Sequence, residues 1–233
     1  MRILYVFPHP DDEAFGPSVA MSQQIVQGHE VFLLTLTKGG ATQERHRFGY
    51  SILKMGTIRE KELRASAKVI GLSGLRVCDY PDGGLKLLDP RILEGEILQS
   101  IDDWQPQVLV SYAVHGISGH HDHLVCHAVV KMAFLSAVAA TTVRRLAFYT
   151  SPPPAPGRRK CFFSTNDEID CLVTGTEADR KCFLKTLECY ATYQDRIERS
   201  GITRAKHKKV YFEFFGESFE NWLDDLTKSL PDK

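Results

Sequence analysis

Two short segments gather side chains of the kind that bind metal ions. Residues 8–13 (Pro-His-Pro-Asp-Asp-Glu) place one histidine before three consecutive acids, and residues 116–123 (Gly-Ile-Ser-Gly-His-His-Asp-His) end in three histidines and an aspartate. Adjacent carboxylates repel one another unless a cation neutralises them. Imidazole combined with carboxylate suits Zn²⁺, and also Mn²⁺ or Fe²⁺. The pattern predicts two halves of a metal site with open coordination positions, which a catalytic metal requires.

Each of these segments follows a predicted buried strand. Residues 3–7 (Ile-Leu-Tyr-Val-Phe) are continuously apolar and rich in strand formers, and residues 108–114 precede the second segment. In open α/β sheets, sites form at the carboxyl ends of the strands, so both segments should meet at one edge. The alternative is a solvated loop in which Asp122 only caps the helix that begins near Leu124.

The remaining pattern alternates strands and helices. Further strands are predicted over residues 31–36, 75–80, 145–150 and 209–215, and helices over 14–27, 57–70, 90–104, 124–140, 176–193 and 217–226. This order predicts an α/β fold: a Rossmann-like three-layer sandwich with a mostly parallel central sheet and helices on both faces. We expect one domain over residues 1–233, with a proline-rich loop near 151–158.

Composition narrows the classes of partner. Lys plus Arg and Asp plus Glu both number 29, so the net charge is zero and gives no general attraction to nucleic acid or anionic membrane. The N-terminus lacks the long apolar stretch of a signal peptide, and no apolar run is long enough to span a bilayer. The six cysteines form no C-x-x-C pair and are interpreted as reduced thiols, so we expect a cytoplasmic protein.

The two metal-binding segments also resemble the motifs of a known family. Residues 9–13 resemble the A-H-P-D-D-E signature of the LmbE-like (PIG-L) zinc N-deacetylases, and residues 119–123 resemble their G-H-P-D-H motif. Residues 59–62 fit an R-x-x-E pattern, and residues 80–85 look like the family's D-G-x-L loop. The resemblance covers roughly residues 1–195.

The resemblance implies a role for each motif residue. One Zn²⁺ per chain, or another divalent transition metal, would be bound by His9, Asp12 and His123. Asp11 would be the general base that takes a proton from the attacking water. His120 would stabilise charge on the carbonyl oxygen, Asp122 would orient His120, and Glu13 would fix the first loop.

Substrate contacts follow less directly from the motifs. The expected substrate-binding residues are Arg45, Arg59, Asp82 and Ser118. Each has an alternative: Arg45 as a solvated loop charge, Arg59 as the partner of a structural ion pair, and Asp82 as part of a turn. Two residues depart from the family pattern, because His121 replaces a proline and Ser118 stands where some members place a tyrosine.

The predicted function is removal of the N-acetyl group from a small molecule that contains N-acetylglucosamine. The N-terminal motif looks closest to bacillithiol-pathway deacetylases, whose substrate is a malate glycoside. Alternatives are an amidase of thiol S-conjugates and a non-catalytic metal-binding α/β protein. A dinucleotide-binding module is disfavoured because no G-x-G-x-x-G follows the first strand. The family also implies a homo-oligomer, such as a hexamer, and neither a nucleic acid nor a membrane as partner.

Overall fold

The computed structural model describes residues 1–154, 162–204 and 209–231. A seven-stranded sheet has the order β3-β2-β1-β4-β5-β7-β6. Its strands are β1 (Arg2–Phe7), β2 (Glu30–Thr37), β3 (Gly74–Tyr80), β4 (Val108–Tyr112), β5 (Arg145–Thr150), β6 (Cys171–Thr174) and β7 (Lys209–Phe214). The first five strands pair in parallel, and β7 pairs antiparallel with both β5 and β6.

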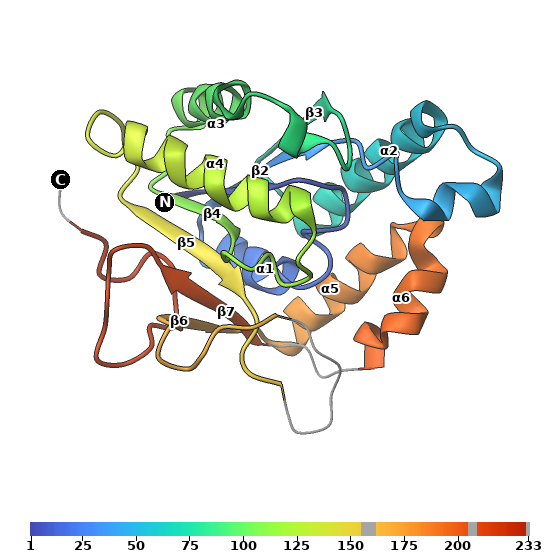
Figure 1. Cartoon of the computed structure of the whole chain (residues 1–233). Helices are drawn as coiled ribbons and strands as arrows, with labels where there is room; N and C mark the ends of the chain where they lie inside the picture. Colours follow the sequence, from blue (N-terminus) through green and yellow to red (C-terminus); the bar gives the residue numbers. More distant parts are fainter. Residues whose placement is uncertain (155–161, 205–208, 232–233) are drawn as a thin grey trace.

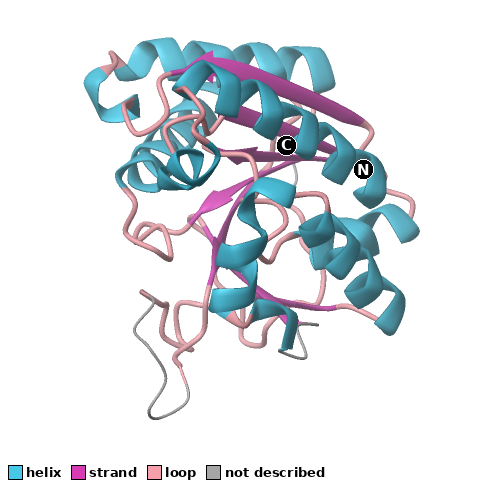
Figure 2. Cartoon of the chain, turned by 90° about the vertical axis from the view of Figure 1, so that its right-hand side faces the viewer, coloured by secondary structure: helices cyan, strands magenta, loops and turns pink. Residues whose placement is uncertain are grey.

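Helices cover both faces of the sheet (Figures 1 and 2). The α-helices are α1 (Ser18–Val26), α2 (Ile52–Ile70), α3 (Pro90–Trp104), α4 (His121–Ala137), α5 (Glu177–Glu188) and α6 (Gln194–Ser200). Short 3₁₀ helices are η1 (Gln43–Phe48), η2 (Leu85–Leu87), η3 (Ala191–Tyr193) and η4 (Ile202–Arg204). One apolar cluster joins the sheet to α1, α2 and α5, and a second joins it to α3 and α4. This arrangement confirms the predicted three-layer α/β fold.

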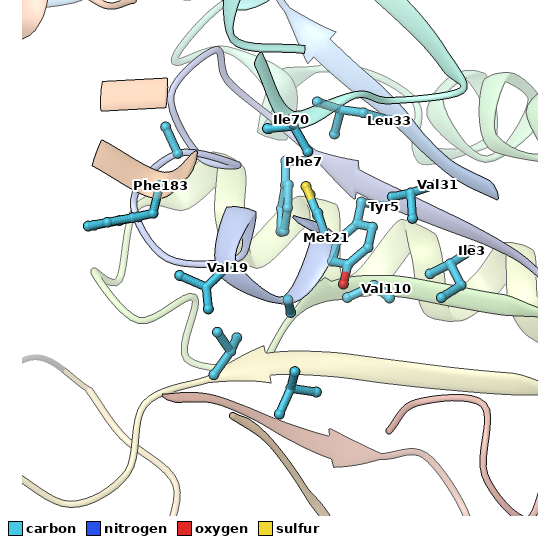
Figure 3. Close-up of a cluster of buried hydrophobic side chains, with 14 of the residues drawn as sticks. Ile3, Tyr5, Phe7, Val19, Met21, Val31, Leu33, Ile70, Val110 and Phe183 are labelled. Carbon is cyan, nitrogen blue, oxygen red and sulfur yellow. The ribbon is translucent and has the colours of Figure 1, made fainter. Parts of the chain in front are cut away.

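The central strand β1 contributes to both clusters because successive side chains point to opposite faces. Ile3, Tyr5 and Phe7 pack in the first cluster (Figure 3), and Leu4 and Val6 pack in the second. Burying one large apolar side chain contributes roughly 1.5–3 kcal/mol. The strand that leads into the acidic segment of residues 8–13 is therefore held by packing on both faces.

Helix boundaries follow the capping residues. Asp89 caps α3 through the backbone N–H of Arg91, with Pro90 at the first helical position, so α3 begins at the predicted residue 90. Thr176 and Asp179 form a reciprocal capping box at the start of α5. The predicted start of α2 at residue 57 is wrong: the Ser51 side chain caps the helix, which therefore begins at Ile52, five residues earlier.

The carboxyl-terminal third differs most from the prediction. Strand β6 was not predicted, and the helix predicted over residues 217–226 is wrong, since that segment consists of turns and irregular chain. Of the expected proline-rich loop, residues 155–158 lie outside the described residues. Among the described helices, none is long and apolar enough to cross a membrane.

Candidate active site

The acidic segment forms a tight turn directly after β1. The backbone N–H of His9 donates to Asp12 Oδ2 at 2.8 Å, and the Thr37 N–H donates to the Pro8 carbonyl at 2.9 Å, which ties the turn to β2. Asp11 has a φ of +92°, a region that non-glycine residues rarely adopt. Such strain is found where a side chain must be aimed, and here it aims the Asp11 carboxylate.

The histidine-rich segment links β4 to α4. Three residues of this turn have a positive φ: Gly116 (φ +60°), Ile117 (φ +58°) and Gly119 (φ +70°). A Cβ atom on Gly116 would lie 2.7 Å from the Cβ of His123, so only glycine fits there. The turn delivers His120 to the N-cap of α4 and places Asp122 and His123 in its first turn.

His123 presents one ring nitrogen to the acidic turn. Its Nδ1 donates to the Gly116 carbonyl at 2.9 Å, which fixes the tautomer and leaves Nε2 as the lone-pair atom. That Nε2 lies 3.4 Å from Asp12 Oδ1. The ring stacks on Tyr112, with centroids 4.2 Å apart and planes 7° apart.

His9 also has one ring nitrogen fixed by neighbouring groups and the other facing Asp12. Its Nε2 faces two carboxylates, Asp122 Oδ2 at 3.1 Å and Asp82 Oδ1 at 3.3 Å, and carboxylates only accept hydrogen bonds. The other nitrogen, Nδ1, lies 3.5 Å from Asp12 Oδ2. Burial opposes protonation of His9, but hydrogen bonds to Asp12, Asp122 and Asp82 outweigh it and raise the pKa of His9.

Asp12 therefore stands between two imidazole nitrogens, one at each carboxylate oxygen. Tyr112 also donates to Asp12 Oδ1, at 2.8 Å. Burial favours the neutral acid, but His123, His9 and Tyr112 together lower the pKa of Asp12 and keep it ionised. Two nitrogens and one carboxylate are a donor set that fits Zn²⁺ with an open position.

His120 lies beside this donor set. Its ring centroid is 4.8 Å from that of His9, and ligand atoms of His9, His120 and His123 lie within 4.8 Å of one another. The Asp122 N–H donates to His120 Nδ1 at 3.2 Å, which leaves Nε2 as a donor toward a neighbouring group. Burial and the neighbouring His9 and His123 lower the pKa of His120.

Asp11 is held by Arg59, for which the sequence left open a substrate contact or a structural ion pair. Arg59 Nη2 lies 2.9 Å from Asp11 Oδ2 and also donates to the Pro10 carbonyl, while Nη1 donates to the Gly39 carbonyl at 2.9 Å. The guanidinium is buried, with 2% of the residue exposed. Burial raises the pKa of Asp11 to about 7, and the charge of Arg59 opposes that rise.

Glu13 lies behind the turn and joins it to two distant elements. Glu13 Oε2 accepts from the Asp11 N–H at 3.2 Å, and Oε1 accepts from Ser66 Oγ and from the Tyr190 hydroxyl, both at 2.6 Å. Burial raises the pKa of Glu13. The carboxylate thus supports the backbone of Asp11.

The other expected site residues divide into two groups. Asp82 Oδ1 lies 3.3 Å from His9 Nε2, and Ser118 Oγ lies 3.5 Å from His123 Nδ1, so both contact candidate metal ligands. Arg45 does not reach them: its Nη1 donates to the carbonyls of Ala41 and Thr42, both at 3.1 Å.

The Asp122 carboxylate makes different contacts from those expected of it. It accepts hydrogen bonds from the N–H groups of Gly83 at 2.7 Å and Leu85 at 3.2 Å, besides its contact with His9. In this structure Asp122 therefore orients His9, and its link to the His120 ring runs through its own backbone N–H. Tyr112, Tyr190 and Tyr193, which also line or support the site, lie outside the two motifs and carried no signal in the sequence.

The fold and the site together define an α/β protein with a candidate metal centre at the carboxyl edge of its parallel strands. A family model described as PIG-L, GlcNAc-PI de-N-acetylase, matches residues 4–134, more than half of the chain. The chain belongs to the PIG-L family, as the two motifs predicted.

Curated relatives are similar over part of their length. The chain is 27% identical over 154 residues to a mycothiol S-conjugate amidase of Streptomyces coelicolor, covering 59% of this chain and 53% of the relative. It is 32% identical over 125 residues to a probable N-acetyl-alpha-D-glucosaminyl L-malate deacetylase 2 of Bacillus anthracis, covering 52% and 54%. The chain thus spans about half the length of these relatives.

Solved structures share the fold over nearly the whole chain. A 4-carboxy-2-hydroxymuconate hydratase of Pseudomonas putida has a TM-score of 0.71 at 16% identity, covering 94% of this chain and 98% of that one. An N,N'-diacetylchitobiose deacetylase of Pyrococcus horikoshii has a TM-score of 0.67 at 16% identity, covering 92% and 83%. Because a hydratase and a deacetylase share it, the fold alone does not specify the reaction.

Proposed function

We propose that this protein is a zinc-dependent hydrolase that removes the N-acetyl group from a small molecule containing N-acetylglucosamine. The observation that carries the proposal is the convergence of His9 Nδ1 and His123 Nε2 on the two oxygens of Asp12, with Asp11 and His120 beside them. Storing a metal would need only the first three residues. Adding an acid–base carboxylate and a hydrogen-bond donor is what amide hydrolysis requires.

The metal would be held by His9, Asp12 and His123. A zinc ion bound there supplies Lewis acidity, which polarises a carbonyl and lowers the pKa of water. The carboxylates of Asp82 and Asp122 hold His9 Nε2 and thereby aim Nδ1 at the metal position. The Gly116 carbonyl accepts a hydrogen bond from His123 Nδ1 and thereby aims Nε2 at the metal position.

The remaining residues handle the proton and the developing charge. Asp11 takes a proton from the attacking water and returns it to the leaving amine of the sugar. His120 donates through Nε2 to the carbonyl oxygen as negative charge builds on it. Arg59 holds one oxygen of Asp11, so the carboxylate keeps a fixed orientation while it transfers the proton.

The substrate class is inferred from the relatives. Several are named as deacetylases of N-acetylglucosamine linked to inositol, malate or phosphatidylinositol, so the shared unit is the N-acetylated sugar. The similarity to a mycothiol S-conjugate amidase favours a second candidate, an amidase of thiol S-conjugates with the same hydrolytic residues. The two candidates differ in the amide that is cleaved, an N-acetyl group of a sugar or the amide of a thiol S-conjugate.

The test combines metal analysis with amine release. We expect about one zinc per chain by mass spectrometry, and release of free amine from methyl and malate N-acetylglucosaminides. Release only from a thiol S-conjugate would assign the amidase instead. A zinc-loaded protein that releases amine from none of these compounds would contradict the proposed hydrolase.

Asp11→Asn separates catalysis from metal binding. This variant should retain zinc, because Asp11 is not among the ligands, while kcat falls by about 100-fold or more, since proton transfer by a positioned group contributes 10²–10⁴-fold. Asp12→Asn should instead lose the zinc. Asp102→Asn, an exposed substitution on α3, is the matched control and should keep both zinc and activity.

A further inference from the structure

A short segment far along the chain closes over the acidic turn. Residues 190–193 lie beyond the 4–134 region that the family model matches, yet two of their side chains contact residues of the site and a third contacts α2 beside it. The Tyr190 hydroxyl donates to Glu13 Oε1 at 2.6 Å. Thr192 donates to Glu62 from its N–H at 2.8 Å and from Oγ1 at 2.7 Å. These buried contacts fix the segment's backbone against α2.

Tyr193 uses this fixed backbone to cover Arg59. The Arg59 Cζ lies 4.1 Å from the centroid of the Tyr193 ring, the distance of a close cation–π contact. Arg59 Nε has no hydrogen-bond partner among the residues that the structure describes. The Tyr193 ring therefore stabilises the guanidinium charge from one face by a cation–π contact. Nη1 and Nη2 meanwhile contact Gly39, Pro10 and Asp11.

The hydroxyl of Tyr193 fixes the ring from its far end. It donates to Thr42 Oγ1 at 2.6 Å, and Thr42 is the N-cap residue of η1. The ring is thus held at its backbone through Thr192 and Glu62 and at its tip through Thr42. A ring held at both ends prevents Arg59 from swinging out of its contacts, so the position of Arg59 is set by residues from three separate elements.

We propose that Tyr193 is a positioning residue for Asp11, acting through Arg59. This inference rests on the role of Asp11 in the proposed function. Tyr193 fixes the guanidinium, the guanidinium fixes Asp11 Oδ2, and Asp11 then faces the attacking water in one orientation. Because Tyr193 touches none of the proposed metal ligands, its loss should change proton transfer and leave the metal centre intact.

The first test replaces the ring. In the zinc-loaded full chain, Tyr193→Leu should lower kcat by about 10–100-fold, the effect of a small misplacement of a reacting group. The KM, the zinc content and the absorption spectrum of the Co²⁺-substituted protein should stay unchanged. Tyr193→Phe keeps the ring over Arg59 but loses the hydrogen bond to Thr42, so its kcat should lie between those of Tyr193→Leu and the wild type. Tyr211→Leu, which removes a partly buried tyrosine of β7, is the matched control.

The second test asks whether the effect passes through Arg59. Arg59→Lys keeps the positive charge but cannot make the several hydrogen bonds of the guanidinium. Tyr193→Leu should therefore lower kcat much less in the Arg59→Lys variant than in the wild type. An equal fall in kcat when Tyr193→Leu is added to the wild type and to Arg59→Lys would overturn the inference. A Tyr193→Leu variant with full kcat would also overturn it, as would one whose kcat falls only in proportion to its loss of zinc. If Tyr193→Leu does not fold, Tyr193→His in the same two backgrounds gives the same comparison. A wild type without amine release would instead refute the proposed function, and this inference with it.

Discussion

At the scale of single residues, the candidate site depends on contacts between residues far apart in the sequence. The proposed metal ligands lie in two recognisable motifs, and their residue types alone predicted a metal site. Tyr112 is different: it ends strand β4, and nothing in its sequence context distinguishes it from a core tyrosine. Only the structure shows its hydroxyl on Asp12 and its ring on His123. Arg59 and Asp11 were both identified from the sequence, but the ion pair between them was not predicted.

Tyr112→Phe tests the support of the metal ligands. The change removes the 2.8 Å hydrogen bond to Asp12 Oδ1 and keeps the ring that stacks on His123. Because groups that hold a metal ligand tune its affinity, zinc affinity should fall by about 10–100-fold. A competition titration with a chromophoric chelator measures it. Tyr5→Phe removes another buried hydroxyl bond, to Gln24, and should leave zinc affinity unchanged.

At the scale of elements, the sequence predicted a strand or helix best where the local residue pattern matches the burial of that segment in the fold. The apolar runs of β1, β2, β4 and β5 are buried on both faces, so composition alone identified them. Strand β6 has only four residues and lies at the sheet edge, which leaves too short a pattern to recognise. The segment after β7 has helical composition, but its partners in the folded chain override that preference.

The end of α3 gives a stabilising prediction at this scale. Gln105 is the C-cap residue and has φ +45° and ψ +55°, a left-handed conformation that favours glycine. Gln105→Gly should raise the free energy of unfolding by about 0.5–1 kcal/mol, since relief of the left-handed strain exceeds the entropy cost of glycine. Urea unfolding measures the change. Gln105→Ala keeps a Cβ and should bring no such gain, and equal gains from both variants would rule out this explanation.

At the scale of the whole molecule, one buried arginine anchors residues 217–229, the segment that follows β7, to the sheet. Arg145 of β5 has 0% exposure and makes a two-pronged contact with Glu217, Nε to Oε1 at 2.9 Å and Nη2 to Oε2 at 2.6 Å. Its guanidinium also donates to the carbonyls of Leu226 and Lys228 at 2.7 Å and of Ser229 at 3.0 Å. These bonds hold residues 217–229 in turns and explain why no helix forms there.

Replacing Arg145 should therefore weaken the entire fold. Arg145→Met keeps the length and apolar stem of the side chain but leaves Glu217 and three carbonyls without their donor. Breaking a buried ion pair in this way costs about 3–5 kcal/mol. The midpoint of urea unfolding should fall accordingly, with one transition by fluorescence and circular dichroism. Arg91→Met, which breaks the solvent-exposed pair with Asp89, should leave the midpoint unchanged. If Arg145→Met instead unfolds in two transitions, the carboxyl-terminal third is a separate cooperative unit, and the sheet formed by β1 to β4 with the candidate metal site does not depend on it for stability.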